Sequence, residues 1–271
     1  FDDFHFFAEL GLDGSLKDTS SIFAIILSLA KQGKIKKVLI PEESVSKISA
    51  IPNIEIYSVK TLKESIDFFT NEDKIKYKVE KENFGFDHLN INGKNYYFQQ
   101  KYDQDFCDIK GQNIAKRAAL ISAAGNHNIL MEGSPGCGKT MIAKRIPYIT
   151  HPMTLEEILE KAKLDSLQGK DPNFEPQRKF ISPHHSSTKA SIIGGTKIGE
   201  ISLSNNGVLF FDELPHFSKN LLESMREPLE DHSVLVSRVN TKINHPTKFL
   251  FVAAMNPCPC GNLLSKTKNC R

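Results

Sequence analysis

The chain has 271 residues, a formal net charge of +3, 25% charged residues and 39% hydrophobic residues. Its length favours two domains, and its composition excludes a disordered or collagen-like chain. No apolar run reaches the roughly 18 residues of a membrane-spanning helix, and the net charge is too small to indicate a nucleic-acid partner by itself.

Residues 1–75 alternate between helix and strand patterns. Apolar residues recur at helical spacing in Ser20–Gln32 and Leu62–Phe69, and short apolar runs at Lys37–Pro41 and Ile54–Val59 are typical of strands. Such alternation predicts a small α/β domain.

Residues 76–104 are expected to form a linker and a hairpin. The charged stretch Asn71–Asn83 is typical of a linker or an exposed edge. Within Asp87–Gln100, the pair Asn92-Gly93 stands between two strand-like runs, which predicts a β-hairpin with a type I′ turn.

Residues 105–271 have the pattern of a nucleotide-binding α/β domain. Helices are predicted at Gln112–Ala124 and Lys139–Arg145, and a buried strand at Asn128–Glu132. Two further runs, Val208–Phe211 and Phe249–Ala254, are apolar at every position. Such runs are typical of a parallel sheet that is covered on both faces.

The loop Gly133-Ser134-Pro135-Gly136-Cys137-Gly138-Lys139-Thr140 matches the P-loop (Walker A) pattern at every fixed position, between a predicted strand and a predicted helix. Its glycines let backbone N–H groups surround phosphates, and the start of the following helix favours negative charge. Lys139 is expected to reach the β and γ phosphates, and Thr140 to ligate Mg²⁺. We therefore expect ATP and Mg²⁺ as cofactors, with Cys137 as a packing residue at a variable position.

Polar residues also follow the two apolar strands. Asp212 and Glu213 come directly after Val208–Phe211, where Asp212 can hold Mg²⁺ and Glu213 can act as the general base toward water. Asn256 follows the last strand, in the place called sensor 1 in AAA+ proteins. The order of these signals along the chain predicts Lys139, Glu213 and Asn256 as catalytic residues.

These motifs and several others resemble the YifB/ComM family of magnesium-chelatase-like AAA+ proteins, from about Asp105 to Arg271. The stretches that carry the resemblance are Asp108-Ile109-Lys110-Gly111-Gln112, Ser182-Pro183-His184-His185, Gly199-Glu200-Ile201-Ser202-Leu203, Asn206-Gly207 with the following strand to Leu214, Pro228-Leu229-Glu230-Asp231, Ser237-Arg238 and Asn256-Pro257-Cys258-Pro259-Cys260-Gly261. The resemblance implies an ATP-hydrolysing AAA+ domain with a parallel sheet.

For relatives of the ComM type, the resemblance further implies a hexameric ring that acts as a helicase or branch-migration factor on DNA in recombination and natural transformation. A protein-remodelling subunit, as in magnesium chelatase, is the alternative. The family pattern places the arginine finger and the sensor 2 arginine beyond Arg271. Because the sequence also begins at Phe1 rather than Met, we interpret it as a fragment.

The front of the chain resembles the second half of the Lon protease's proteolytic domain, an α/β domain of the S5 type. Glu9-Leu10-Gly11-Leu12-Asp13-Gly14 and Lys37-Val38-Leu39-Ile40-Pro41-Glu42-Glu43 carry this resemblance. The position of Lon's catalytic lysine corresponds to Phe23 or Ala24, neither of which can act as a base. Lys17 lies nearby and is expected to be a solvated loop residue, so we expect no peptidase activity.

Five cysteines without regular spacing argue against a disulfide scaffold and for a reducing cytosol, so we expect a cytoplasmic protein. Cys258, Cys260 and Cys270 have the short spacing of thiolate ligands for Zn²⁺, but reduced structural cysteines fit equally well. His184 and His185 are expected to point apart on a strand, which disfavours a metal site there.

The resemblance places an inserted loop at Ser191–Gly199 and a hairpin at Val234–Lys248, which face the central pore in related ring motors. The basic residues of this region are Lys189, Lys197, Arg238, Lys242 and Lys248. They fit phosphate contacts with DNA and fit scattered surface lysines equally well.

Overall fold

The chain divides into two compact units, each of which is described by itself. Unit 1 comprises Phe1–Asp87 and Leu155–Glu175, and unit 2 comprises His88–Thr154 and Pro176–Arg271. The computed structural model describes residues 4–70, 73–81, 84–195, 197–238, 241–258, 260 and 263, without the side chains of residues 237, 238, 241 and 242. Leu155–Glu175, which we expected within the 105–271 domain, packs in unit 1.

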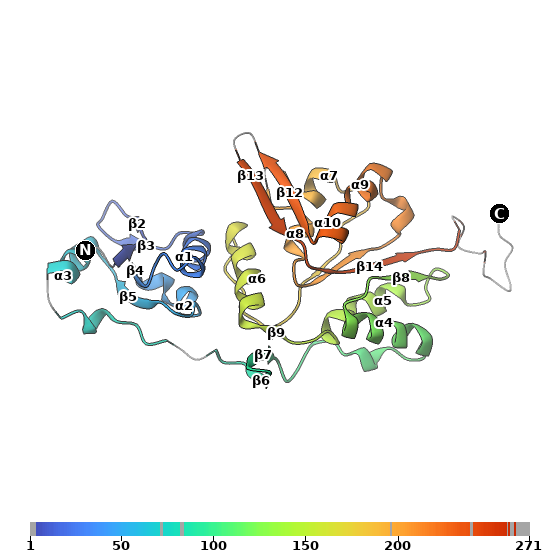
Figure 1. Cartoon of the computed structure of the whole chain (residues 1–271), viewed down its shortest axis with the longest axis horizontal. Coiled ribbons are helices and arrows are strands. Elements are labelled where there is room, and N and C mark those ends of the chain that lie inside the picture. Colours follow the sequence, from blue (N-terminus) through green and yellow to red (C-terminus); the bar gives the residue numbers. More distant parts are fainter. Residues whose placement is uncertain are drawn as a thin grey trace. The chain divides into compact units, whose positions relative to one another are not determined.

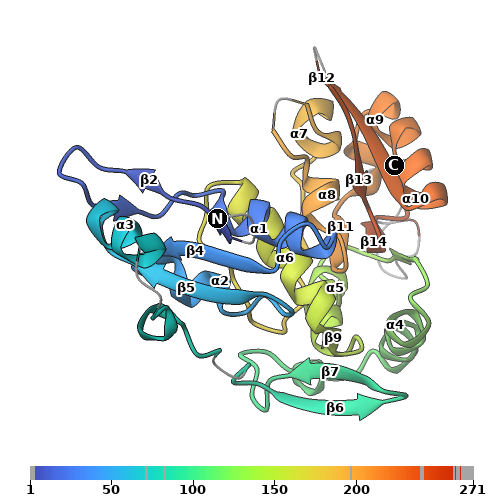
Figure 2. The same ribbon diagram turned by 60° about the vertical axis from the view of Figure 1, so that its left-hand side comes forward.

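Unit 1 is an α/β unit around a three-stranded parallel sheet with the order β1-β4-β5. Its strands are β1 (Phe4–Phe6), β2 (Glu9–Leu10), β3 (Leu16–Lys17), β4 (Lys37–Pro41) and β5 (Glu55–Val59). Its helices are α1 (Ile22–Lys31), η1 (Glu42–Ser44), α2 (Val45–Ile48), α3 (Leu62–Thr70), η2 (Ile75–Tyr77) and α6 (Leu155–Leu167). Figure 2 shows β4 and β5 side by side. The predicted helices and strands of residues 1–75 are thus confirmed.

Each face of this sheet is covered by a separate apolar cluster. Val38 and Ile40 of β4 pack with α1, α2 and α6 on one face. Leu39, between them, packs with Tyr57 and with Phe68 of α3 on the other face. Because successive strand residues point to opposite faces, the all-apolar strand β4 supplies both clusters.

Helix α6 completes the first of these clusters, although it lies between two parts of unit 2 in the sequence. Its Leu159 is 1% exposed and packs with α1, and the ring of Phe174 meets that of Phe23 edge-on at 5.4 Å. Ser166 Oγ donates a hydrogen bond to Ser20 O at 2.6 Å. Apolar packing and a side-chain hydrogen bond therefore both join the segment Leu155–Glu175 to α1 and to the turn before α1.

Lys47 forms the charged part of the same junction. Its Nζ lies 2.7 Å from Asp171 Oδ1 and 2.7 Å from Asp18 Oδ2. Hydrogen bonds to Asp171 and Asp18 raise the pKa of Lys47 above its ordinary value. The hydrogen bond from Lys47 in turn lowers the pKa of Asp171.

The linker and hairpin follow the predicted pattern. Val79 N–H donates to Ile56 O at 2.9 Å, so part of the charged stretch lies along β5 as an exposed edge. Strands β6 (Asp87–Ile91) and β7 (Lys94–Phe98) flank Asn92 and Gly93, whose φ angles are 51° and 78°. Two successive positive φ angles are those of a type I′ turn, which confirms the predicted hairpin.

Unit 2 is built on a four-stranded parallel sheet with the order β10-β11-β14-β8. Besides β7 and all but the first residue of β6, its strands are β8 (Ile129–Glu132), β9 (Met153–Thr154), β10 (Phe180–Ile181), β11 (Val208–Phe211), β12 (Ser233–Arg238), β13 (Thr241–Pro246) and β14 (Leu250–Met255). Its helices are η3 (Phe106–Asp108), α4 (Asn113–Gly125), α5 (Lys139–Arg145), η4 (Ile146–Tyr148), α7 (Lys189–Ile193), α8 (Glu200–Leu203), η5 (Leu214–His216), α9 (Lys219–Ser224) and α10 (Arg226–Asp231).

Strand β11 is buried on both faces, as its all-apolar sequence predicts. Val208 and Phe210 pack with α4 and α5, which lie beside β8 in Figure 1. Leu209 and Phe211 pack with α7, α8 and α9. The sheet is therefore the middle layer of three.

Strand β8 corrects one prediction, since it is only partly buried. It lies at the edge of the described sheet and pairs with β14 alone. Met131 packs with α4 and α5, but Leu130 is 52% exposed and is not part of the apolar cluster that α7, α8 and α9 form on the other face. The remaining predicted strand forms as β14, and the predicted hairpin at Val234–Lys248 forms as β12 and β13. None of the described helices is long and apolar enough to cross a membrane.

Candidate active site

The site lies where three parallel strands of unit 2 end side by side. Glu132 of β8 is opposite Met255 of β14, and Phe211 of β11 is opposite Ala253 of β14. The residues that follow these strands therefore emerge at one edge of the sheet. They are Gly133, Asp212 and Asn256.

The loop after β8 takes a conformation that requires glycine at two positions. Gly136 has φ +77° and Gly138 has φ +94°, values that side chains with a Cβ atom rarely adopt. Gly133 N–H donates to Met255 O at 3.3 Å, which ties the beginning of the loop to β14. The two glycine conformations and this hydrogen bond let the chain turn from β8 into α5 within a few residues.

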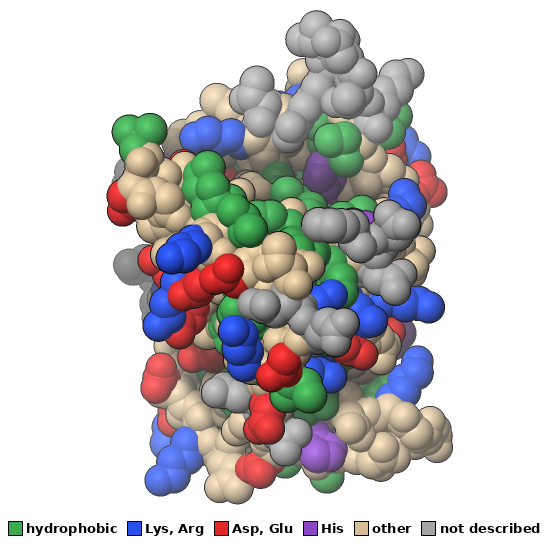
Figure 3. Space-filling model, turned by 90° about the vertical axis from the view of Figure 1, so that its left-hand side faces the viewer, with side chains coloured by type: hydrophobic (Ala, Val, Ile, Leu, Met, Phe, Trp, Pro, Cys, Tyr) green, Lys and Arg blue, Asp and Glu red, His purple; other side chains and the backbone are tan. Residues whose placement is uncertain are grey.

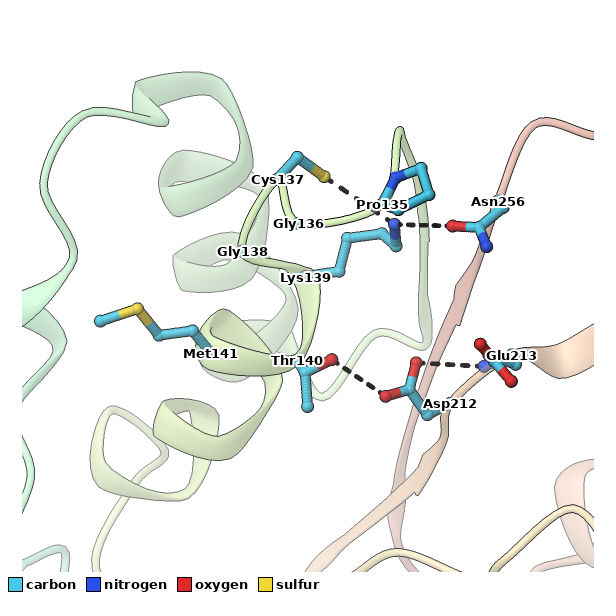
Figure 4. A pocket seen from close by; sticks show the side chains of 10 residues that line it. All are labelled: Pro135, Gly136, Cys137, Gly138, Lys139, Thr140, Met141, Asp212, Glu213 and Asn256. Atoms are coloured by element: carbon cyan, nitrogen blue, oxygen red, sulfur yellow. Dashed lines mark hydrogen bonds between the residues drawn. The ribbon is translucent and has the colours of Figure 1, made fainter. Parts of the chain in front are cut away.

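Lys139, the first residue of α5, directs its ammonium group back over this loop (Figure 4). Its Nζ donates to Gly133 O at 2.7 Å, to Ser134 O at 3.1 Å and to Asn256 Oδ1 at 3.2 Å. The Sγ of Cys137 lies 3.8 Å away. The ammonium group thus lies inside the loop, joined to the tip of β14.

Thr140 joins the loop to the strand β11. Its Oγ1 donates to Asp212 Oδ2 at 2.9 Å, and Asp212 Oδ1 accepts a hydrogen bond from Glu213 N–H at 3.1 Å. A hydroxyl and a carboxylate at this distance are a hard oxygen donor pair of the kind that Mg²⁺ takes in phosphate sites.

A cavity of about 370 Å³ opens between these groups. The residues that line it, labelled in Figure 4, are Pro135, Gly136, Cys137, Gly138, Lys139, Thr140, Met141, Asp212, Glu213 and Asn256. The structure therefore brings together the predicted residues from three separate segments. Gly133 and Ser134 contribute the carbonyl groups that hold Lys139. Met141 was not predicted.

Two further contacts of the site were not predicted from the sequence. Gln112 Nε2 donates to Cys137 O at 3.2 Å and so supports the loop from the beginning of α4. His216 Nδ1 lies 3.0 Å from Glu213 Oε2. Gln112 belongs to a motif of the resembled family, and His216 follows Glu213 by three residues, a spacing that brings side chains together in a 3₁₀ turn.

The prediction that His184 and His185 point apart is wrong. They lie in the loop after β10 rather than on a strand, and their ring centroids are 4.2 Å apart. His184 Nδ1 is 2.7 Å from Ser186 Oγ. The alternation of a strand does not apply to a loop, so adjacent side chains can lie in contact.

The cysteine cluster is described only in part. Cys258 Sγ and Cys260 Sγ are 3.3 Å apart, and Leu263 N–H donates to Cys258 Sγ at 3.3 Å. Cys270 lies outside the described residues. Among those that are described, no group of three or more His, Cys, Asp or Glu side chains is arranged to hold a metal ion. The zinc assignment stays a prediction.

The basic residues of the expected DNA-facing loops are also described in part. Lys189 Nζ lies 3.4 Å from Asn220 Oδ1, and Lys197 and Lys248 are exposed. The side chains of Arg238 and Lys242 lie outside the description. Contacts with DNA therefore stay a prediction.

In unit 1, the positions that correspond to the Lon lysine are apolar and buried. Phe23 is 1% exposed and Ala24 is 3% exposed, both on the inner face of α1. Lys17 is exposed on β3. The position that corresponds to the Lon lysine is thus occupied by a core residue of α1.

Comparisons with known proteins identify the family of the chain. A sequence model of the family described as "Magnesium chelatase, subunit ChlI" matches residues 105–271. The competence protein ComM of Haemophilus influenzae is 40% identical over 266 residues, which are 96% of this chain and 50% of that protein. The protein YifB of Salmonella typhimurium and that of Escherichia coli are each 44% identical over 171 residues, 61% of this chain and 34% of each relative. The chain thus spans about half the length of the first of these relatives. It belongs to the ComM/YifB family of magnesium-chelatase-like AAA+ proteins.

Proposed function

We propose that unit 2 binds ATP with Mg²⁺ and hydrolyses it. The observation that carries the proposal is the convergence of Lys139, Thr140, Asp212, Glu213 and Asn256 on one cavity at the ends of three parallel strands. An ammonium group on a glycine-rich loop neutralises the β and γ phosphates of a nucleotide.

Thr140 and Asp212 are the residues that would hold Mg²⁺. Their oxygen atoms are 2.9 Å apart, and the carboxylate is anchored by the N–H group of Glu213. When bound, Mg²⁺ neutralises the charge that develops on the phosphate oxygens. The hydroxyl of Thr140 and the carboxylate of Asp212 have no other role in this proposal.

Glu213 is the proposed general base. It lines the cavity beside Asp212, and its side chain is 49% exposed, so water can reach its carboxylate. Asn256, which follows β14, accepts a hydrogen bond from Lys139 Nζ and would lie near the γ-phosphate. A carboxylate in such a place accepts a proton from the attacking water, a contribution of about 10²-fold or more.

The test of this proposal is the Glu213→Gln variant of the full-length protein. The amide keeps the shape of the side chain but cannot accept the proton. We expect ATP to bind as in the parent, measured by titration, while phosphate release falls at least about 100-fold. Turnover within about threefold of the parent would assign the base to another residue.

We further propose that the whole protein is a ring-forming, hexameric motor on branched DNA in recombination and natural transformation. The proposal is supported by the match to a competence protein over 96% of this chain. On the face in Figure 3, the described Lys and Arg side chains lie among Asp and Glu side chains and form no separate basic patch. We therefore assign the DNA contacts to the loops of unit 2. Stimulation of ATP hydrolysis by branched DNA, but not by duplex DNA alone, is the expected result.

A protein-remodelling ATPase is the second candidate, because the family match itself is to a magnesium chelatase subunit. The two candidates differ in what stimulates hydrolysis. Stimulation by a partner protein, with no response to any DNA structure, would favour the remodelling function.

We propose that unit 1 derives from a Lon-like domain, with residues 1–75 as its core, and acts as a docking module rather than a peptidase. Phe23 and Ala24 support this, because both are buried apolar side chains and neither can take a proton from a serine. The full-length protein should show no ATP-dependent cleavage of casein. Cleavage that disappears when a serine is substituted would support the protease alternative.

A further inference from the structure

His216 contacts the proposed base but is not part of the cavity lining. Its Nδ1 lies 3.0 Å from Glu213 Oε2. A carboxylate can only accept a hydrogen bond, so the imidazole Nδ1 is the donor. The two side chains are 58% and 49% exposed, which leaves this hydrogen bond close to the mouth of the site.

The backbone places the imidazole where this bond can form. Glu213 has φ 54° and ψ 51°, in the left-handed region that residues with a Cβ atom rarely adopt, and it directly precedes η5. His216 N–H donates to Glu213 O at 2.8 Å. Glu213 and His216 are therefore joined twice, through the backbone and through their side chains.

A second ring restricts the imidazole from the loop after β10. The ring centroid of His185 is 5.9 Å from that of His216, with the planes at 73°. An edge-to-face contact of this kind favours one orientation of the ring. The Nδ1 atom of His216 thus has both a partner and a defined direction.

The contact gives the two oxygen atoms of the Glu213 carboxylate different roles. Oε2 accepts from His216, while the same side chain lines the cavity with Lys139 and Asn256. A carboxylate that is fixed through one oxygen loses less rotational freedom when the other oxygen meets water. Free rotation of an exposed glutamate would otherwise oppose a productive geometry.

We propose that His216 is a positioning residue for Glu213, which holds Oε2 so that Oε1 faces the water that attacks the γ-phosphate. This inference rests on the proposed ATP hydrolysis. It assigns to His216 an effect on turnover and none on nucleotide binding.

The experiment compares His216→Ala and His216→Asn in the full-length protein, with His88→Ala as the control. Asparagine places an N–H group close to where Nδ1 lies, whereas alanine removes the donor. His88 is an exposed histidine of β6 whose ring lies beside that of Tyr97, and it does not line the cavity. The readouts are kcat, the Kd for a non-hydrolysable ATP analogue, and the melting temperature.

We expect His216→Ala to lower kcat about tenfold with an unchanged Kd, and His216→Asn to restore kcat to within about threefold of the parent. In the Glu213→Gln background, His216→Ala should cause no further loss. An unchanged or increased kcat in His216→Ala, or equal losses in the Ala and Asn variants, would overturn the assignment. These outcomes are distinct from failure of the proposed function, in which the parent itself hydrolyses no ATP or Glu213→Gln remains active.

Discussion

Replacement of Lys139 by alanine tests the phosphate-binding role of the loop most directly. All three N–H donors of an ammonium group have acceptors here, namely the carbonyl oxygens of Gly133 and Ser134 and the amide oxygen of Asn256, at 2.7 to 3.2 Å. A bound nucleotide would offer charged phosphate oxygens in their place. Lys139→Ala removes those charge-assisted hydrogen bonds and leaves the backbone N–H groups of the loop unchanged.

The expected magnitude follows from the number of hydrogen bonds. A hydrogen bond to a charged group contributes about 1.5 to 3 kcal/mol, and two of them toward the β and γ phosphates give about 3 to 6 kcal/mol. The contacts with Gly133 and Ser134 in the nucleotide-free protein offset part of this gain. A net loss of about 3 kcal/mol corresponds to at least a 100-fold increase in Kd for ATP.

The assay is titration of the full-length protein with a fluorescent ATP analogue in the presence of Mg²⁺. Lys144→Ala is the matched control, because Lys144 lies in the same helix but is exposed and does not line the cavity. Its Kd should equal that of the parent. A Kd for Lys139→Ala within about threefold of the parent value would refute the phosphate-loop assignment.

Three further substitutions test other parts of the structure. Thr140→Val removes a hydroxyl at constant volume and should raise the Mg²⁺ concentration for half-maximal ATP hydrolysis at least about tenfold; an unchanged requirement would contradict the ligand assignment. Phe23→Ala should cost about 3 to 5 kcal/mol in denaturant unfolding of unit 1, whereas Ile25→Ala, on the exposed side of α1, should cost less than about 1 kcal/mol. Lys47→Met should cost at most about 1 kcal/mol, and this difference should be constant from about pH 5 to pH 9. It should decrease in acid, as pH falls through the lowered pKa of Asp171, and in alkali, as pH rises through the raised pKa of Lys47; a difference that is the same in strong acid as at neutral pH would contradict the ion-pair explanation.

Local chemistry was enough to predict the elements whose causes are local. The Asn92-Gly93 turn is specified by two residues that tolerate positive φ. The burial of β11 follows from four successive apolar residues. The phosphate loop needs glycine at 136 and 138 because of their backbone angles. In each case the responsible residues are adjacent in the sequence.

The features that were missed depend on segments far apart in the chain. Leu130 is exposed because β8 lies at the edge of the described sheet, and its own apolar sequence does not reveal the strand order. The rings of His184 and His185 lie side by side because β10 ends before them, so the alternation of a strand does not separate them. The contact between His216 and Glu213 was missed because it requires the left-handed backbone at Glu213, which no residue type specifies.

Because of helix α6, the core of unit 1 depends on residues that follow the phosphate loop in the sequence. The core of unit 1 contains Leu159 from this helix and the neighbouring Phe174, which meets Phe23. Residues 1–87 alone would leave this face of α1 exposed to water, at a cost of about 25 cal/mol for each Å² of apolar surface. Unit 1 can therefore be completed only after residue 175, when the phosphate loop is already part of the chain. The two units are consequently interleaved rather than successive, and substitutions in α6 act on the stability of unit 1 although this helix lies within the segment that matches the chelatase family.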